Sequence, residues 1–74
     1  MKDLILYMAQ SLVDDPGAVQ VRQIEGTHSV IIKLAVAPDD MGKVIGKQGK
    51  IAKAMRTLLA VTAAREGKRA TLEI

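Results

Sequence analysis

The chain has 74 residues, no cysteine, a single aromatic residue (Tyr7) and a net charge of +3. A chain of this length buries only about 60% of its unfolded surface, and without cysteine it can form no disulfide or thiolate metal site, so we expect one domain, residues 1–74, with a small aliphatic core. No run of about 18 apolar residues could span a membrane, and the first residues lack the layout of a signal peptide, so we expect a cytoplasmic protein.

The first elements are a helix and a strand. Residues 2–13 carry apolar side chains at helical spacing, and the Asp-Asp-Pro-Gly run at 14–17 is expected to end the helix because proline cannot continue it. Residues 19–25 are rich in β-branched side chains and predict a strand. Ile24 is out of phase with the alternation of this strand, which indicates a β-bulge.

The clearest strand of the chain follows. Residues 26–28 (Gly-Thr-His) predict a hairpin loop, and residues 29–37 alternate regularly between two faces. The expected buried face consists of Val30, Ile32, Leu34 and Val36. The two strands are expected to pair antiparallel because the loop between them is short.

The second half of the chain predicts two helices and a last strand. Pro38 and Asp39 are typical of a helix start, with Asp39 as the expected N-cap. This helix must be short because a glycine-containing break follows at residues 46–49. Good helix formers occupy residues 50–65, and residues 69–74 alternate as a strand.

The element order α-β-β-α-α-β restricts the topology. Two helices separate the second strand from the third, which implies a right-handed parallel crossover. We therefore expect an α+β fold, in which three helices pack on one face of a three-stranded mixed sheet.

The break between the two helices carries the strongest chemical signal. Gly46 and Gly49 permit positive φ and a close approach of another chain, and the segment leads into a helix N-terminus with partial positive charge. Basic side chains without an acidic neighbour surround it: Lys43, Lys47, Lys50, Lys53 and Arg56. This combination predicts a site for a sugar-phosphate backbone. We expect Val44 and Ile45, just before the break, to offer aliphatic surface to bases.

Residues 44–49, Val-Ile-Gly-Lys-Gln-Gly, resemble the Ile-Gly-x-x-Gly signature of the KH domain, a module that binds RNA and single-stranded DNA. The element order resembles the type II form, and the whole chain is similar to the bacterial KhpA family. Ala52 departs from the pattern, because many KH domains carry a larger aliphatic residue there. The predicted RNA-binding residues are Lys43, Val44, Ile45, Gly46, Lys47, Gln48, Gly49, Lys50 and Lys53.

The resemblance implies a small protein that binds single-stranded RNA, acts as an RNA chaperone, and works with KhpB (also Jag or EloR), a larger KH-domain protein. It further implies a link to cell elongation and cell-wall homeostasis. No cofactor, metal, membrane or small-molecule substrate is expected, and nothing supports enzymatic activity. The alternative is an assembly subunit, whose KH fold mainly serves interaction with KhpB or with itself.

Two other nucleotide- or DNA-binding motifs match this segment less well. Residues 42–47 are unlike a P-loop, because only three residues separate the glycines and Gln48 stands where Ser or Thr is required. A helix-turn-helix is the closer rival, although it seldom occurs with a three-stranded sheet. Tyr7 lies far from the glycine segment in the sequence, so we expect binding without aromatic stacking and therefore weak affinity at a single site.

The long helix at residues 50–65 has two apolar faces. The expected core-facing positions are Ala52, Met55, Leu59 and Ala63. A second stripe, Ile51, Ala54, Leu58 and Val61, lies about 100° around the helix. A three-stranded sheet can cover only one of these faces, so the stripe predicts a homodimer interface or a KhpB-binding surface. The alternative is that the first helix packs over it.

Overall fold

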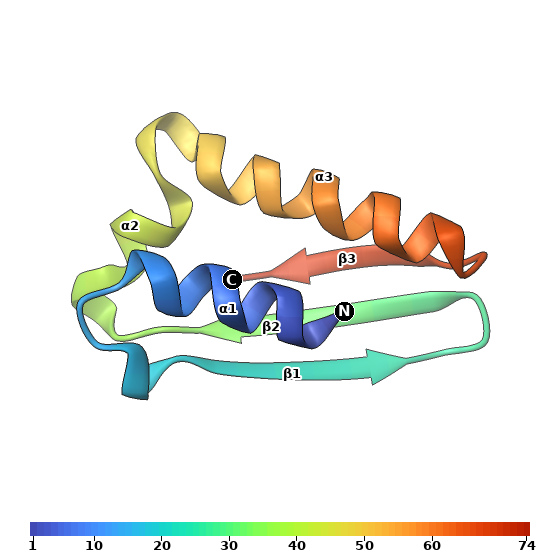
Figure 1. The fold of residues 1–74 in the computed structure, drawn as a ribbon, viewed down its shortest axis with the longest axis horizontal. Helices are drawn as coiled ribbons and strands as arrows, with labels where there is room; N and C mark the ends of the chain where they lie inside the picture. Colours follow the sequence, from blue (N-terminus) through green and yellow to red (C-terminus); the bar gives the residue numbers. More distant parts are fainter.

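The computed structural model describes the backbone of residues 1–74 and every side chain except that of Lys47. The elements follow the expected order (Figure 1). They are α1 (Lys2–Leu12), β1 (Gln20–Glu25), β2 (Ser29–Ala35), α2 (Met41–Ile45), α3 (Lys50–Arg65) and β3 (Arg69–Glu73). The α+β fold with the α-β-β-α-α-β order of a KH domain is confirmed. None of the helices in the described chain is long and apolar enough to cross a membrane.

The sheet has β2 at its centre. β1 pairs with β2 antiparallel and β3 pairs with β2 parallel, so the sheet is mixed as expected. The predicted bulge at Ile24 is wrong: Ile24 pairs in regular register with Ile31 and is half exposed. Val19 and Val21 face the helices, and a regular strand therefore turns Ile24, three residues after Val21, to the opposite, uncovered face.

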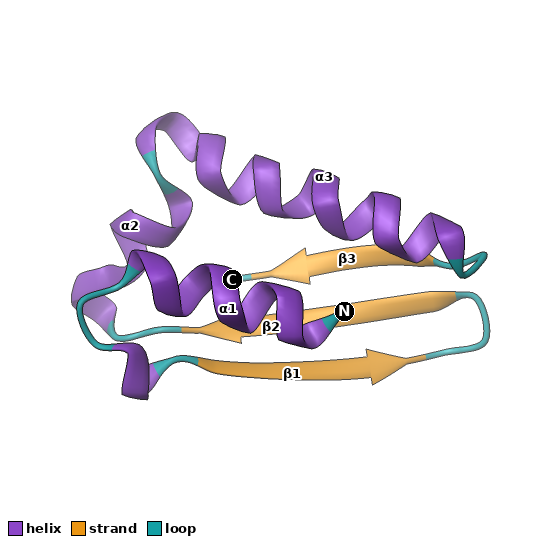
Figure 2. Cartoon of the chain, in the orientation of Figure 1, coloured by secondary structure: helices purple, strands orange, loops and turns teal.

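The core lies between one face of the sheet and the helices. Val30, Ile32 and Leu34 of β2 are buried, and Ile5 and Ala9 of α1 lie in the same cluster. From α3 the buried residues are Ala52, Met55, Leu59 and Ala63, as the helical period predicts. Figure 2 shows α2 and the turn after it joining β2 to the start of α3.

Asp40 is the one buried charged residue among the described side chains. The expected N-cap at Asp39 is wrong, because residues Pro38–Asp40 form a 3₁₀ turn and α2 begins only at Met41, with no side-chain cap. The Asp40 carboxylate instead accepts hydrogen bonds from the backbone N–H groups of Asp14 and Asp15, at 3.2 and 3.1 Å. It thereby fastens the start of α2 to the segment that follows α1.

Candidate nucleic-acid interface

The glycine segment forms a tight loop between α2 and α3. α2 ends where the Gly46 N–H donates to the Gly42 carbonyl at 2.9 Å, and the Gly49 N–H donates to the Gly46 carbonyl at 3.2 Å. Positive φ angles occur at Gly46 (72°), Gln48 (56°) and Gly49 (77°). Backbone geometry and hydrogen bonds therefore give the loop its shape.

Gly46 and Gly49 are required for different reasons. Gly46 has φ 72° and ψ −178°, a region that essentially only glycine adopts. A Cβ on Gly46 would also lie 2.5 Å from Cγ1 of Ile51, so Ile51 occupies the space that a side chain would need. Gly49 has the left-handed conformation (φ 77°, ψ 10°), but a Cβ there would meet none of the described atoms within 4 Å. Only Gly46 is fixed by both conformation and space.

The loop leads into the positive end of α3. Gly49 is the N-cap residue, and the first turn of α3 contains no acidic side chain that would offset the helix dipole. The N–H groups of a first helical turn have no partner within the helix and are available to an anion. Lys50 and Lys53 are exposed on this helix. The predicted contribution of the Lys47 side chain lies outside the described part of the chain and stays a prediction.

Val44 does not offer surface to a ligand, contrary to our expectation. Its side chain is completely buried, whereas Ile45 is 39% exposed. Successive residues of a helix point about 100° apart, so α2 can turn Val44 into the core only by turning Ile45 outward. Val44 anchors the short helix, and Ile45 is the aliphatic side chain accessible beside the loop.

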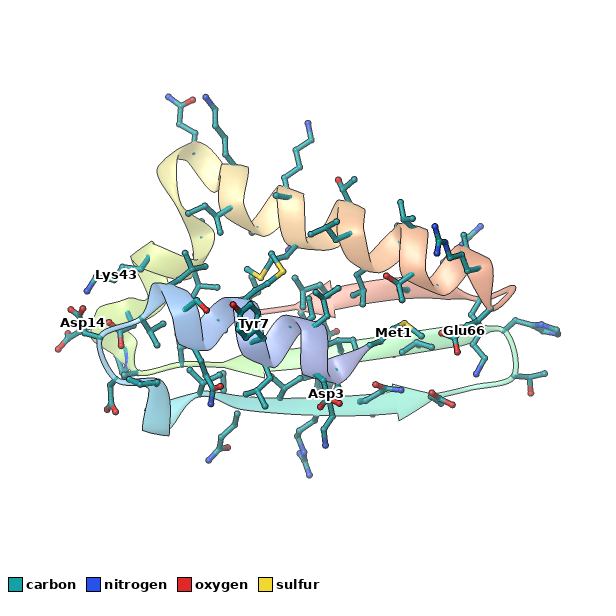
Figure 3. The ribbon with its side chains drawn as sticks, viewed as in Figure 1. Met1, Asp3, Tyr7, Asp14, Lys43 and Glu66 are labelled. Carbon is teal, nitrogen blue, oxygen red and sulfur yellow. The ribbon has the colours of Figure 1, made fainter. Side chains whose placement is uncertain are left out.

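Lys43 forms ion pairs with two carboxylates. Its ammonium donates to Asp14 and lies 3.5 Å from an Asp40 oxygen, and Figure 3 shows Lys43 next to Asp14 and apart from the loop. The hydrogen bond to Asp14 and the attraction of both carboxylates raise the pKa of Lys43 above its ordinary value. Lys43 is thus better placed to hold α2 than to bind phosphate, because it would have to leave two anions first.

Asp40 stays ionised at the centre of this cluster. Burial alone would raise the pKa of Asp40, but the hydrogen bonds from the N–H groups of Asp14 and Asp15, together with Lys43, hold it below its ordinary value of 3.8. No group of three or more His, Cys, Asp or Glu side chains that could hold a metal ion occurs among the described residues. The cluster is therefore best understood as a clamp at the base of α2.

The second apolar stripe of α3 remains largely uncovered. Leu58 is 45% exposed, Val61 is 53% exposed and Ala54 is also exposed, whereas Ile51 is half-buried. α1 packs chiefly against β1, and it does not lie over Leu58 and Val61. The alternative in which α1 covers the stripe is thus realised only near Ile51.

Sequence reasoning missed a groove between α1 and α3. The groove has a volume of about 430 Å³ and is lined by Tyr7, Met8, Ser11 and Leu12 of α1 and by Lys50, Ile51 and Ala54 of α3. Tyr7, which is remote from the loop in the sequence, therefore stands across from the first residues after the loop. The one available signal was an aromatic residue in a helix whose other large apolar side chains are all aliphatic.

The chain matches known proteins over its whole length. A family model described as "KhpA/KhpB, KH domain" matches residues 2–74. Proteins named "RNA-binding protein KhpA" from Clostridium acetobutylicum and Caldanaerobacter subterraneus are each 55% identical over 100% of this chain and 99% of the relative. The protein of the same name from Aquifex aeolicus is 49% identical over 100% of this chain and 94% of its own length. No solved structure gave a significant match. The chain belongs to the KhpA/KhpB family of KH-domain proteins.

Proposed function

We propose that this protein binds single-stranded RNA by holding its sugar-phosphate backbone against the loop at residues 46–49. The observation that carries the proposal is the loop itself, a glycine-dependent backbone turn that opens onto the uncompensated positive end of α3. The relatives from three bacteria are named RNA-binding proteins, which supports the same ligand.

The chemistry of the site suits phosphates that follow one another along a strand. The N–H groups of the first turn of α3 point toward one phosphate, and Lys50 and Lys53 supply full charges along the neighbouring backbone. Loops of this kind hold about four nucleotides. We propose roles for Gly46, Lys47, Gln48, Gly49, Lys50, Lys53 and Ile45, and none for the buried Val44 or the ion-paired Lys43.

The test is the affinity of a labelled RNA oligonucleotide for a variant with Lys47→Asp and Gln48→Asp. Aspartate tolerates the left-handed backbone of position 48 comparatively well, so the charge changes while the loop shape is kept. We expect binding to collapse. Lys33→Asp is the matched control, because Lys33 lies on β2 and pairs with Glu73 at 3.8 Å. Equal losses in both variants would contradict a site at the loop.

Salt and strand state provide the second test. The logarithm of the association constant should fall with the logarithm of salt concentration, with a slope of about −0.7 for each phosphate neutralised on a single strand. Binding that does not depend on salt would contradict phosphate contacts. A clear preference for duplex DNA over a single strand of equal length would favour the helix-turn-helix alternative.

We also propose that the stripe of Ile51, Ala54, Leu58 and Val61 pairs two copies of the chain, or one copy with a KhpB-type partner. The exposure of Leu58 and Val61 favours this, since covering apolar surface stabilises a complex by about 25 cal/mol per Å². These two side chains would carry the contact, and Ile51 and Ala54, which also line the groove between α1 and α3, would lie at its edge. Two loops in one particle would raise the effective concentration of each for RNA. The chaperone activity, the cytoplasmic location and the link to cell elongation that the resemblance implies belong to the same proposal.

Leu58→Asp tests the pairing by sedimentation. We expect a wild-type dimer and a folded, monomeric variant. A wild type that is monomeric at high micromolar concentration would rule out self-association. The alternative function is an assembly subunit with incidental RNA binding. The variant with aspartates at positions 47 and 48 distinguishes the two: its affinity for RNA should collapse if the loop binds RNA, whereas its binding to a partner chain should survive under either function.

A further inference from the structure

The groove between α1 and α3 is lined mainly by aromatic and aliphatic side chains. Its α1 wall presents Tyr7, which is 72% exposed, together with Met8 and Leu12. Figure 3 shows Tyr7 on α1. The Ser11 hydroxyl donates to the Tyr7 carbonyl at 2.8 Å, so this polar group is already satisfied. What remains is an aromatic and aliphatic surface that is accessible from solvent.

The groove begins where the loop ends. Lys50 and Ile51, on its α3 wall, are the first two residues after Gly49, and Ala54 lies four residues further along. At 1.5 Å per residue the α3 wall extends about 6 Å from the helix start. The Ile51 side chain also fills the space that a Cβ on Gly46 would need, so one side chain borders both the loop and the groove.

We propose that this groove receives a base of the RNA strand whose backbone lies on the loop, and that Tyr7 stacks on that base. The proposal rests on the function proposed above and names the part of the ligand that its loop does not hold. Among the described side chains, Lys50 is the only charged one that lines the groove, and a cation at this end matches the phosphate of the inserted nucleotide.

The chemistry of the lining predicts how selective this contact is. Aromatic stacking accepts any base, because every base has a π-face. None of the lining residues that the structure describes has a side-chain amide or carboxylate that could read a base edge. The contact should therefore add affinity with little sequence preference. It also revises our expectation that this chain binds without aromatic stacking, which the sequence distance between Tyr7 and the loop had suggested.

The chain provides its own reporter for this contact. Tyr7 is the only tyrosine and there is no tryptophan, so intrinsic ultraviolet fluorescence comes from Tyr7 alone. We expect a short uridine oligonucleotide to quench this fluorescence as it binds, after correction for absorption with N-acetyltyrosinamide. Tyr7→Ala should weaken binding by about 5- to 150-fold, the usual effect of removing a stacking aromatic, while Tyr7→Phe should bind like the wild type. Alanine is a good helix former and position 7 is exposed, so both variants should remain folded.

An oligonucleotide without bases separates this inference from the proposed function. The same sugar-phosphate chain with abasic residues should bind wild type and Tyr7→Ala equally. If Tyr7→Ala binds the uridine oligonucleotide like the wild type while the aspartates at positions 47 and 48 abolish binding, the groove proposal is wrong and the loop proposal stands. If the aspartates have no effect, the loop proposal itself fails. If the Tyr7 fluorescence yield per molecule changes with protein concentration in the absence of RNA, and does not change on adding RNA, a second copy of the chain occupies the groove and the inference is overturned.

Discussion

Three glycines within eight residues should respond to alanine in three different ways. Gly42 lies inside α2 with nothing within 4 Å of an added Cβ, Gly49 has the same open space but a φ of 77°, and Gly46 has both a φ of 72° and a blocked Cβ position. The chemical change is identical in each variant. Differences in stability therefore measure the backbone conformation and the space separately.

The magnitudes follow from these geometries. Gly42→Ala should stabilise the fold by about 0.5–1 kcal/mol, the usual difference in a helix interior. Gly49→Ala should cost about 0–1.5 kcal/mol, because left-handed strain of about 1–2 is partly offset by the lower entropy of the unfolded chain. Gly46→Ala combines strain of about 1–3 kcal/mol with about 1–3 for displacing Ile51, giving a net loss of about 1–6. The whole domain is expected to have only about 4–11 kcal/mol of stability.

Urea denaturation followed by circular dichroism measures all three variants. The expected order of stability is Gly42→Ala, wild type, Gly49→Ala and Gly46→Ala. Ile51→Ala in the Gly46→Ala background should recover the steric part of the loss, which a double-mutant cycle reports as a coupling of about 0.5–3 kcal/mol between the two positions. Equal losses at Gly46 and Gly49, or no coupling between Gly46 and Ile51, would refute the assignment of a blocked site at Gly46.

Two further predictions concern the core and the acidic clamp. Leu59→Ala should lower the free energy of unfolding, measured in urea, by about 2–5 kcal/mol because Leu59 is 1% exposed. Leu58 is 45% exposed, so Leu58→Ala should change the stability of the monomer by about 0.5 kcal/mol or less. Similar losses in the two variants would contradict the placement of the two faces of α3. The lowered pKa of Asp40 means that its stabilisation is fully present above pH 3.8 and is lost as the pH falls through the lower folded-state value. Asp40→Asn should therefore lower the melting temperature at pH 7 and flatten its decline below pH 3.8, and an unchanged acid profile would show that this carboxylate does not stabilise the fold.

Local patterns predicted most of the fold. The pattern of residues 50–65 gave the bounds of α3 and its four buried positions. The alternation of residues 29–37 gave the buried Val30, Ile32 and Leu34, but β2 ends at Ala35, so the predicted strand was two residues too long and Val36 is only half-buried. The error at the start of α2 arose because a side chain bonds outside its own element. Asp39 looks like an N-cap by position, yet Asp40 accepts from amides 25 and 26 residues earlier, a contact for which the local sequence holds no pattern.

The candidate site was predictable in part for the same reason. The glycine spacing located the loop, because backbone conformation there depends on residues that are adjacent in the chain. The surroundings of Lys43 and Tyr7 could not be predicted, since they are set by tertiary structure: the Lys43 ammonium donates to Asp14, and Tyr7 lines a groove together with the first residues of α3. The number of lysines near the loop in the sequence therefore overstated the number that are free of carboxylate partners, and distance along the sequence did not indicate that Tyr7 shares a groove with the start of α3.

The clamp at the base of α2 has a consequence for binding. A helix of five residues is not stable alone, and α2 is held by the buried Val44 and by the bonds of Asp40 to the segment after α1. These anchors fix the residues that enter the loop before any ligand arrives. The conformational entropy of ordering the loop is thus lost on folding and not on association, which strengthens binding without an additional contact. Asp40, which lies outside the loop, is in this way expected to contribute to the affinity for RNA that we propose.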